Sequence, residues 1–370
     1  MTKPPGSARG SVSPMTLLLR VVAGVSSVAL LGGVLWYALS DETKRDALAR
    51  LGDATPLQIT GLAVLSFLGI VFNGLVFWLL ILPVKRLSLL SVVSTNAIAT
   101  FLASVPFKLS VIVRVAVHRK RDGVEFAYIG PWFAAIAVSL AASLGPLAVA
   151  STLEREITPR WIGIAGGLVL VSWATIGLVA RFAVGGRALR FVRAIGKRQP
   201  IGAIERALHT PFVTKLDRGL GMLCDPVTVA LVLVTRIVDM LGIAARFMIA
   251  AAVLGVALDP GAALVFAVSY FTIGVLAPTG SVGSREAGTG VVVAMTAGDD
   301  ATRDLLTLVP IVVGGAELVI NAASAGLATL YIRPDRLLAG SDPADGPPDA
   351  AAPLDSTDAD LPEPDQPDRR

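Results

Sequence analysis

Long, uninterrupted runs of apolar residues limit the folds that this 370-residue chain can adopt. A helix that crosses the hydrocarbon core of a bilayer needs about 20 mostly apolar residues. Charged residues make up only 16% of the chain, against about 25% in a soluble domain. Six runs are long enough to cross: Met15–Leu39, Pro56–Pro83, Phe126–Ser151, Trp161–Val184, Pro226–Leu258 and Leu305–Ile332. We therefore expect an all-α polytopic membrane protein with six full transmembrane helices.

The first run has a second interpretation, because residues 38–40 (Ala-Leu-Ser) resemble a signal-peptide cleavage site. Its apolar stretch is longer than the apolar core of a signal peptide, which is about 7–15 residues. We therefore expect an uncleaved span.

Two further apolar stretches, Leu87–Val117 and Gly261–Ala297, are each broken near the middle. The breaks consist of proline, glycine and basic residues: Pro106 and Lys108 in the first stretch, and Pro278, Gly280, Gly283 and Arg285 in the second. Each stretch is either one kinked span or a re-entrant hairpin, in which two short helices enter the membrane and return to the same side.

Loop charges favour the hairpins, because Lys and Arg concentrate on the cytoplasmic side of membrane proteins. Basic residues gather in segments 85–86, 114–121 and 181–225, whereas segments 41–53 and 299–304 are acidic on balance. All basic segments lie in the cytoplasm and all acidic segments lie outside only if the two broken stretches enter the membrane from opposite faces and return. We therefore expect two re-entrant helical hairpins, an inverted repeat, and both termini in the cytoplasm.

The polar ends of the chain lie outside this predicted membrane domain. Residues 1–14 and 334–370 have too little apolar bulk to fold, so we expect both to be disordered and cytoplasmic. The second segment is rich in proline and carries a net charge of −7, which leaves +11 on the rest of the chain. Residues 15–333 then form one transmembrane domain that includes a basic cytoplasmic segment, 185–225. The composition, rich in Ala, Val, Gly and Arg, is typical of a bacterium, so we expect its cytoplasmic (plasma) membrane.

Several classes of function do not suit this composition. The single cysteine, Cys224, excludes a disulfide framework and a cysteine metal cluster, and the two histidines, His118 and His209, disfavour a histidine metal site or catalytic triad. The arginines lie in short loops between apolar runs, which does not favour nucleic acid. A membrane transferase would need a convergent acid/base pair, and the sequence indicates none. We expect no enzyme activity, metal or cofactor.

The second break predicts an anion-binding site. Gly280 and Gly283 allow a tight backbone, and Ser284 is placed to cap a half-helix that starts near Arg285. The free N–H groups and positive dipole end of such a half-helix favour a phosphate or carboxylate. Glu286 would also favour this N-terminus, and it would hold Arg285 in place. At the first break, Lys108 and Arg114 supply further cations. The alternative is that these residues only close the hairpins and the cations reach water.

Charged residues within the predicted spans are the remaining candidates, since such residues often mark a pathway. Arg236, Asp239 and Arg246 share one helical face because of their spacing, so Asp239 can pair with Arg236 while Arg246 needs another partner. The last span carries Glu317 and, one turn later, Asn321. Glu317 is a candidate partner for an arginine or a proton relay. The alternative is an internal salt bridge and an arginine that reaches the interface.

Two motifs resemble a known family. The first break and its basic loop match in part a Pro-x-Lys/Arg-x-Gly stretch followed by an arginine, through Pro106, Lys108, Arg114 and segment 118–123, although Ser110 replaces the usual glycine. The second break matches a Pro- and Gly-rich segment ending in Gly-x-Arg-Glu, through Pro278, Gly280, Gly283, Arg285 and Glu286. Residues 15–333 thus resemble the flippase-like transmembrane domain of the lysylphosphatidylglycerol synthase family.

The resemblance implies a stand-alone member of that family, because nothing in the sequence looks like its soluble synthase domain. We therefore expect a membrane protein that binds and translocates an anionic lipid or lipid-linked glycan. Arg285, Lys108, Arg114 and Arg246 would bind the substrate, with Gly280, Gly283 and Ser284 shaping the site. Asp239, Arg236, Glu286, Glu317 and Asn321 would supply supporting polar groups. The alternative is a non-transporting accessory subunit that docks an envelope-biosynthesis enzyme such as a glycosyltransferase.

Overall fold

The structure is a computed structural model in which every regular element of the described residues is a helix. It describes residues 36–105, 109–154, 156–183, 221–277, 280–296 and 300–333, with residues 25, 29 and 32–34. Most of the run Met15–Leu39 lies outside these residues, as do the predicted disordered ends, 1–14 and 334–370, and most of the basic segment 185–225. The sixth span and the cytoplasmic termini therefore remain predictions.

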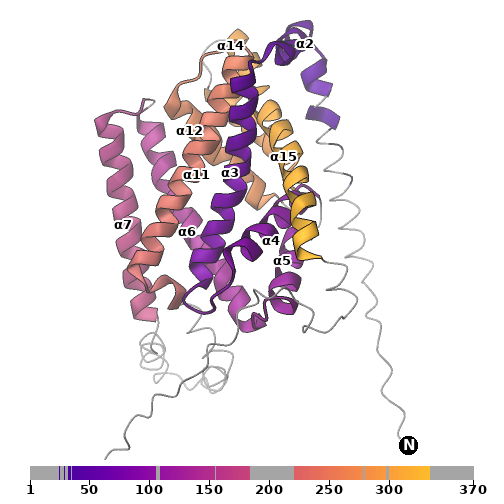
Figure 1. Cartoon of the computed structure of the whole chain (residues 1–370). Coiled ribbons are helices and arrows are strands. Elements are labelled where there is room, and N and C mark those ends of the chain that lie inside the picture. Colours follow the sequence, from indigo (N-terminus) through magenta and orange to yellow (C-terminus); the bar gives the residue numbers. More distant parts are fainter. Residues whose placement is uncertain are drawn as a thin grey trace, which may run out of the picture.

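Five helices are long and apolar enough to cross a membrane, as expected for a multi-pass α-helical membrane protein. They are α3 (Pro56–Ile81), α6 (Phe126–Leu153), α7 (Pro159–Ala183), α11 (Pro226–Val253) and α15 (Val309–Ile332). Figure 1 shows them side by side as a bundle. Each begins within a few residues of an apolar run identified in the sequence, so the hydropathy of those runs is sufficient to predict these helices.

Local signals in the sequence fix where two of these helices begin. Thr55 forms a capping box with Gln58 at the start of α3, and proline follows at the first helical position. At the start of α11, Asp225 accepts hydrogen bonds from the backbone N–H groups of Val227 and Thr228. The hydroxyl of Thr228, which donates to Asp225 over 2.5 Å, and these N–H groups hold the pKa of the Asp225 carboxyl below its usual value.

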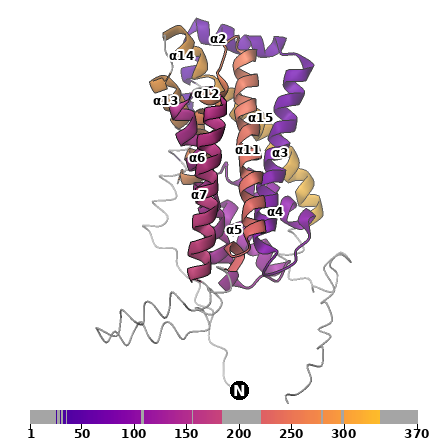
Figure 2. The same ribbon diagram turned by 90° about the vertical axis from the view of Figure 1, so that its left-hand side faces the viewer.

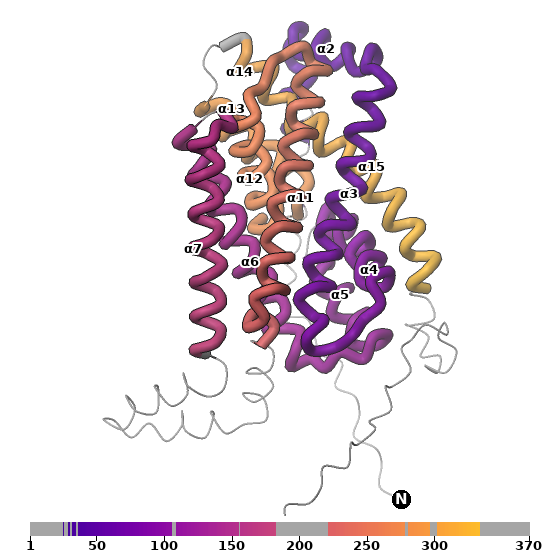
Figure 3. Tube along the Cα trace, turned by 60° about the vertical axis from the view of Figure 1, so that its left-hand side comes forward, coloured from indigo at the N-terminus to yellow at the C-terminus, as the bar shows by residue number. Residues whose placement is uncertain are grey.

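The two broken stretches each form a pair of short helices, with the breaks where the sequence predicts them. The first pair is α4 (Leu89–Leu102) with α5 (Leu109–Lys120), and the second is α12 (Pro260–Leu276) with α13 (Ser284–Thr296). The helices of each pair pack against one another. Figures 1 and 3 show α4 and α5 in one half of the bundle and α12 and α13 in the other.

The segments that lead into and out of each pair lie at the same end of the bundle. At one end, Lys85 before α4 donates to the carbonyl of Gly123 after α5, over 2.9 Å. At the other end, α14 (Asp300–Leu306) follows α13 and packs against α2 (Glu42–Ala49). The short helix η1 (Arg50–Asp53) continues from α2, and its Arg50 donates to the carbonyl of Leu254, which precedes α12. Figure 2 shows α2 and α14 together at that end.

The central helix of the bundle is α11, which contacts α3, α6, α7, α12 and α15. Buried apolar side chains form one cluster around α11 and α12, including Phe247 and Tyr270, and another around α3 and α6, including Leu80 and Trp132. The short helix η3 (Gly221–Leu223) joins the second cluster. By contrast, only 11% of the most apolar 18-residue stretch of α7 is buried within the protein. This low burial suits a helix that faces lipid at the edge of the bundle. The charged residues of α11 therefore lie at the centre of the protein.

Candidate functional site

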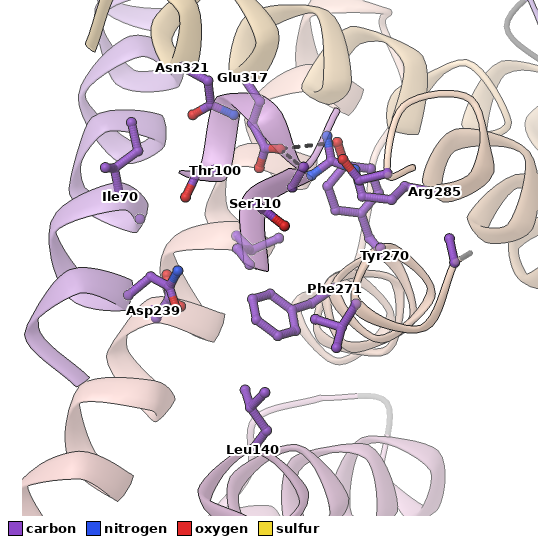
Figure 4. A pocket seen from close by; sticks show the side chains of 18 of the residues that line it. Ile70, Thr100, Ser110, Leu140, Asp239, Tyr270, Phe271, Arg285, Glu317 and Asn321 are labelled. Atoms are coloured by element: carbon purple, nitrogen blue, oxygen red, sulfur yellow. Dashed lines mark hydrogen bonds and ion pairs between the residues drawn. The ribbon is translucent and has the colours of Figure 1, made fainter. Parts of the chain in front are cut away.

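A cavity of about 340 Å³ lies where the breaks of the two short-helix pairs meet. Its walls come from the two pairs and from four of the long helices, α3, α6, α11 and α15. The backbone N–H of Ser281, in the second break, donates to the carbonyl of Ala103, in the first break, over 2.9 Å. The two breaks therefore contact each other beside the cavity, and Figure 4 shows side chains from both pairs at its wall.

Glu317 is the acidic centre of the cavity wall. Its side chain projects from α15, and two arginines bind its carboxylate: Arg285 at 2.7 Å from Oε2, and Arg246 through Oε1. The hydroxyl of Tyr270 donates to Oε2 over 3.3 Å. The carboxylate thus joins α11, α12 and α13 to α15, and Figure 4 shows Glu317 and Arg285 side by side. The predicted role of Glu317 as a partner for an arginine agrees with these contacts.

Arg285 is held in position by its neighbours on α12 and α13. Its guanidinium lies 4.4 Å from the centre of the Tyr270 ring, and Nη2 lies 3.8 Å from the Glu286 carboxylate. The stem of Arg285 crosses Gly274, where an added Cβ would come within 2.5 Å of Cδ. Arg285 can therefore occupy this position only because residue 274 has no side chain.

The second break differs from the expected anion cradle. Gly280 and Gly283 have φ angles of +105° and +79°, so both use the freedom that only glycine has. The N–H of Gly283, however, donates to the Glu286 carboxylate over 2.6 Å. The half-helix is thus capped in part from within by Glu286, as expected for an acid in its first turn, so this N–H is not free for a substrate anion.

Ser284 also differs from its predicted role. It lies inside α13 as its first residue, rather than before the helix as a cap. Its hydroxyl donates to the carbonyl of Gly280 over 3.0 Å. As a helix cap, this hydroxyl would accept a hydrogen bond from a backbone N–H. A serine hydroxyl can also donate, and here it donates to a carbonyl. Ser284 therefore stabilises the turn, and it does not line the cavity.

A second polar cluster follows α11 deeper in the bundle. Arg236 binds Asp239 at 3.2 Å, the local pairing predicted from their spacing, and also donates to the Asn73 carbonyl oxygen over 2.8 Å. The amide of Asn73 donates to Asn96 over 2.8 Å, and Asn96 donates to the backbone carbonyl of Ile70 over 2.7 Å. This cluster joins α11, α3 and α4, and its members are buried except for Asn73, which is half-buried.

Arg114 differs from the other cavity arginines in its partners. It projects from α5 with 8% of its surface exposed, and its guanidinium lies 4.1 Å from the centre of the Phe77 ring. Within the described part of the chain, no carboxylate lies within ion-pair distance of Arg114. Lys108, the other cation predicted at the first break, lies outside the described residues.

The described cavity wall is positively charged overall. Four arginines line it against two carboxylates, a net of +2, and the polar residue Asn321 lines it as well. The charged wall residues are Arg114, Arg236, Arg246, Arg285, Asp239 and Glu317. Three valines that line the cavity, Val105, Val111 and Val275, are 36–48% exposed, so the cavity offers apolar surface as well as arginines. This arrangement suits a ligand with an anionic group and an apolar part.

Sequence reasoning missed the aromatic residues that line the cavity, which are Phe77, Phe133, Tyr270 and Phe271. Tyr270 lies within the apolar run of α12, where it is the only residue with an ionisable side chain, and that contrast is a usable signal. Phe77 lies within an apolar run of α3 that offers no comparable signal. Its contact with Arg114 depends on the packing of α3 beside the first pair.

The segment 118–123, which the resemblance relates to a family motif, lies away from the cavity. His118 Nδ1 lies 2.6 Å from Asp122, and Ser91 donates to the same carboxylate over 3.1 Å. These contacts join the end of α5 to the start of α4. No group of three or more His, Cys, Asp or Glu side chains that could hold a metal occurs among the described residues.

No protein-family model, curated protein or solved structure matches the chain.

Proposed function

We propose that the chain binds an anionic lipid or lipid-linked glycan and translocates it across the bacterial cytoplasmic membrane. The observation that carries this proposal is a cavity lined by four arginines and two carboxylates where two broken helices meet. In the proposed topology, six spans surround two re-entrant hairpins that enter from opposite faces, with both termini in the cytoplasm. The flippase-like family of the lysylphosphatidylglycerol synthases is the proposed relative.

The paths of the two short-helix pairs support the re-entrant topology. The bond from Lys85 to Gly123 brings together the residues before α4 and those after α5. On the opposite side, contacts of α14 and Arg50 bring the end of α13 near the start of α12. Non-helical backbone at membrane depth is tolerated where it is buried in protein or lines a wet cavity, and both breaks adjoin the cavity.

The unequal pairing of the arginines supports an anionic substrate. A charged side chain in a membrane costs about 3 kcal/mol or more on insertion scales, unless a partner compensates. Asp239 and Glu317 compensate Arg236, Arg246 and Arg285, whereas Arg114 contacts the Phe77 ring and pairs with no carboxylate among the described residues. A phosphate is the group that best satisfies an arginine through paired N–H donors. Arg114 is therefore the proposed first contact for the substrate.

The size and surroundings of the cavity support a lipid rather than a free ion. A volume of about 340 Å³ is at the lower end for small-molecule pockets, which suits a headgroup but not acyl chains. The exposed valines at the cavity would contact the acyl chains in the bilayer. An amphipathic substrate could then keep its tails in lipid while its phosphate enters the cavity.

Mass spectrometry of lipids that co-purify in nanodiscs tests the proposal. We expect a phosphate-bearing lipid to be enriched on the wild type and lost from Arg114→Gln. The matched control is Arg121→Gln, because Arg121 also lies over an aromatic ring, that of Tyr331 at 4.7 Å, but does not line the cavity. The enriched lipid would then be labelled and its flipping measured in liposomes that contain each variant.

Two outcomes would contradict the proposal. Equal lipid profiles on the wild type and both variants would favour the accessory-subunit alternative, in which the chain docks an envelope-biosynthesis enzyme. Enrichment without any protein-dependent flipping would leave a lipid-binding protein but would exclude a flippase.

A further inference from the structure

Glu317 occupies the two arginines that an anion entering the cavity would also seek. Its carboxylate oxygens divide between Arg246 on α11 and Arg285 on α13, and 8% of the residue is exposed. The carboxylate and both guanidinium groups line the same cavity. A substrate phosphate and an ionised Glu317 would therefore compete for the same donors and repel each other in a low-dielectric site.

We propose that Glu317 is a proton-coupling group: the anion binds Arg246 and Arg285 when Glu317 takes up a proton. This inference rests on the proposed function and adds the energy source, since each anion would move with one proton. The proton comes from water on the side to which the cavity opens, and the carboxylate becomes a carboxylic acid. The net charge of the cavity wall rises by one on protonation and falls by one when a singly charged phosphodiester binds.

The groups that surround Glu317 suit this role. From α11 it faces Arg246, and Asp239 of the same helix lies farther away on the cavity wall. From α13 it faces Arg285 and Glu286, and from α12 it faces Tyr270. The Tyr270 hydroxyl can donate to the carboxylate or accept from the carboxylic acid, so it can satisfy both protonation states.

Among the described residues, the other elements that pack against α15 add no competing proton acceptor near Glu317. The helices α3 and α4 contain no ionisable residue. Arg303 and Asp304 on α14 precede the start of α15, and Glu317 lies more than two helical turns beyond that start, about 12 Å away.

Glu286 is the natural comparison, because it is a second buried carboxylate beside Arg285. Its oxygens face the N–H of Gly283 and the hydroxyl of Tyr270, and it does not line the cavity. An anion in the cavity would not need to displace it. The coupling role therefore belongs to Glu317, and the role of Glu286 is structural.

Binding of a fluorescent phosphatidylglycerol to the full chain in nanodiscs tests the proposal, with phosphatidylcholine, a zwitterionic lipid without net charge, as the comparison. Between about pH 5 and pH 9, wild-type affinity should rise as the pH falls, by up to about tenfold per pH unit for one linked proton. Glu317→Gln should bind with the low-pH affinity at every pH. Glu286→Gln should retain the wild-type slope, whatever its effect on the affinity itself.

Proton uptake by the wild type provides a second measurement that does not depend on any variant folding. In weakly buffered solution with a pH indicator, one proton should be taken up for each lipid bound. Preferential binding of phosphatidylglycerol with neither a pH slope nor proton uptake would overturn the coupling role and leave the proposed function intact. Equal binding of both lipids at every pH would instead overturn the proposed function.

Discussion

Gly314 and Gly315 are neighbours on α15, but we expect alanine at the two positions to have opposite effects on stability. Gly314 is buried, and an added Cβ would come within 3.0 Å of Glu286 Cδ and 3.2 Å of Cγ, and closer still to the carboxylate oxygen. At Gly315, which is exposed, an added Cβ would meet no atom within 4 Å. Gly314→Ala therefore forces the Glu286 side chain to move, whereas Gly315→Ala does not.

The size of the difference follows from what Glu286 would lose. Both substitutions favour the helix by about 1 kcal/mol, because alanine has the higher helix propensity. In Gly314→Ala, the displaced carboxylate loses its 2.6 Å hydrogen bond from the N–H of Gly283, and hydrogen bonds to charged groups contribute about 1.5–3 kcal/mol. We therefore expect Gly315→Ala to gain about 1 kcal/mol and Gly314→Ala to lose about 0.5–2 kcal/mol.

Reversible unfolding by denaturing detergent in mixed micelles measures both free energies of unfolding. A double-mutant cycle with Glu286→Gln assigns the effect, because Gly314→Ala should be much less damaging where the carboxylate is absent. If Gly314→Ala were as stable as Gly315→Ala, or equally damaging with and without Glu286→Gln, the proposed cap of the second break would be wrong.

Two further substitutions test the site and its support. Gly274→Ala should displace the Arg285 stem and weaken phosphatidylglycerol binding in nanodiscs. Gly290→Ala is the control and should leave binding unchanged, because open space surrounds Gly290. Equal affinities of the two variants would show that Arg285 does not hold the lipid. Asn96→Leu should lower the free energy of unfolding in mixed micelles by about 1 kcal/mol, because it removes interhelical hydrogen bonds. Thr100→Val is its control on α4, since the Thr100 hydroxyl has no hydrogen-bond partner among the described residues. An equal loss in both variants would refute the reasoning.

The helices follow from the sequence because hydropathy and length suffice to define them. The boundaries are less predictable, since backbone geometry determines them. The apolar run that forms α11 continues to Leu258, but the helix ends at Val253, and Gly255 adopts a φ of +80° just beyond it. The last run begins at Leu305, whereas α15 begins only at Val309, beside a proline that is favoured in a first helical turn.

The candidate site is predictable only where its contacts are local. Arg236 and Asp239 pair across three residues of one helix, so their spacing predicts the contact. Glu317 joins helices that are far apart in the chain, and the sequence could name it as a partner without specifying which arginines it binds. Glu286 follows the same rule, because its place in the first turn of a half-helix predicts that its carboxylate accepts from the nearby backbone N–H of Gly283.

The hydrogen bond between Ser281 and Ala103 has a consequence for biosynthesis. The carbonyl of Ala103 receives this partner only after the ribosome has added roughly 180 more residues, which at about 5–20 residues per second takes about 10–40 s. During that interval the first break must satisfy its backbone with water or with an insertion factor. A nascent chain arrested before Ser281 should therefore remain bound to the insertion machinery, and release should follow synthesis of the second pair.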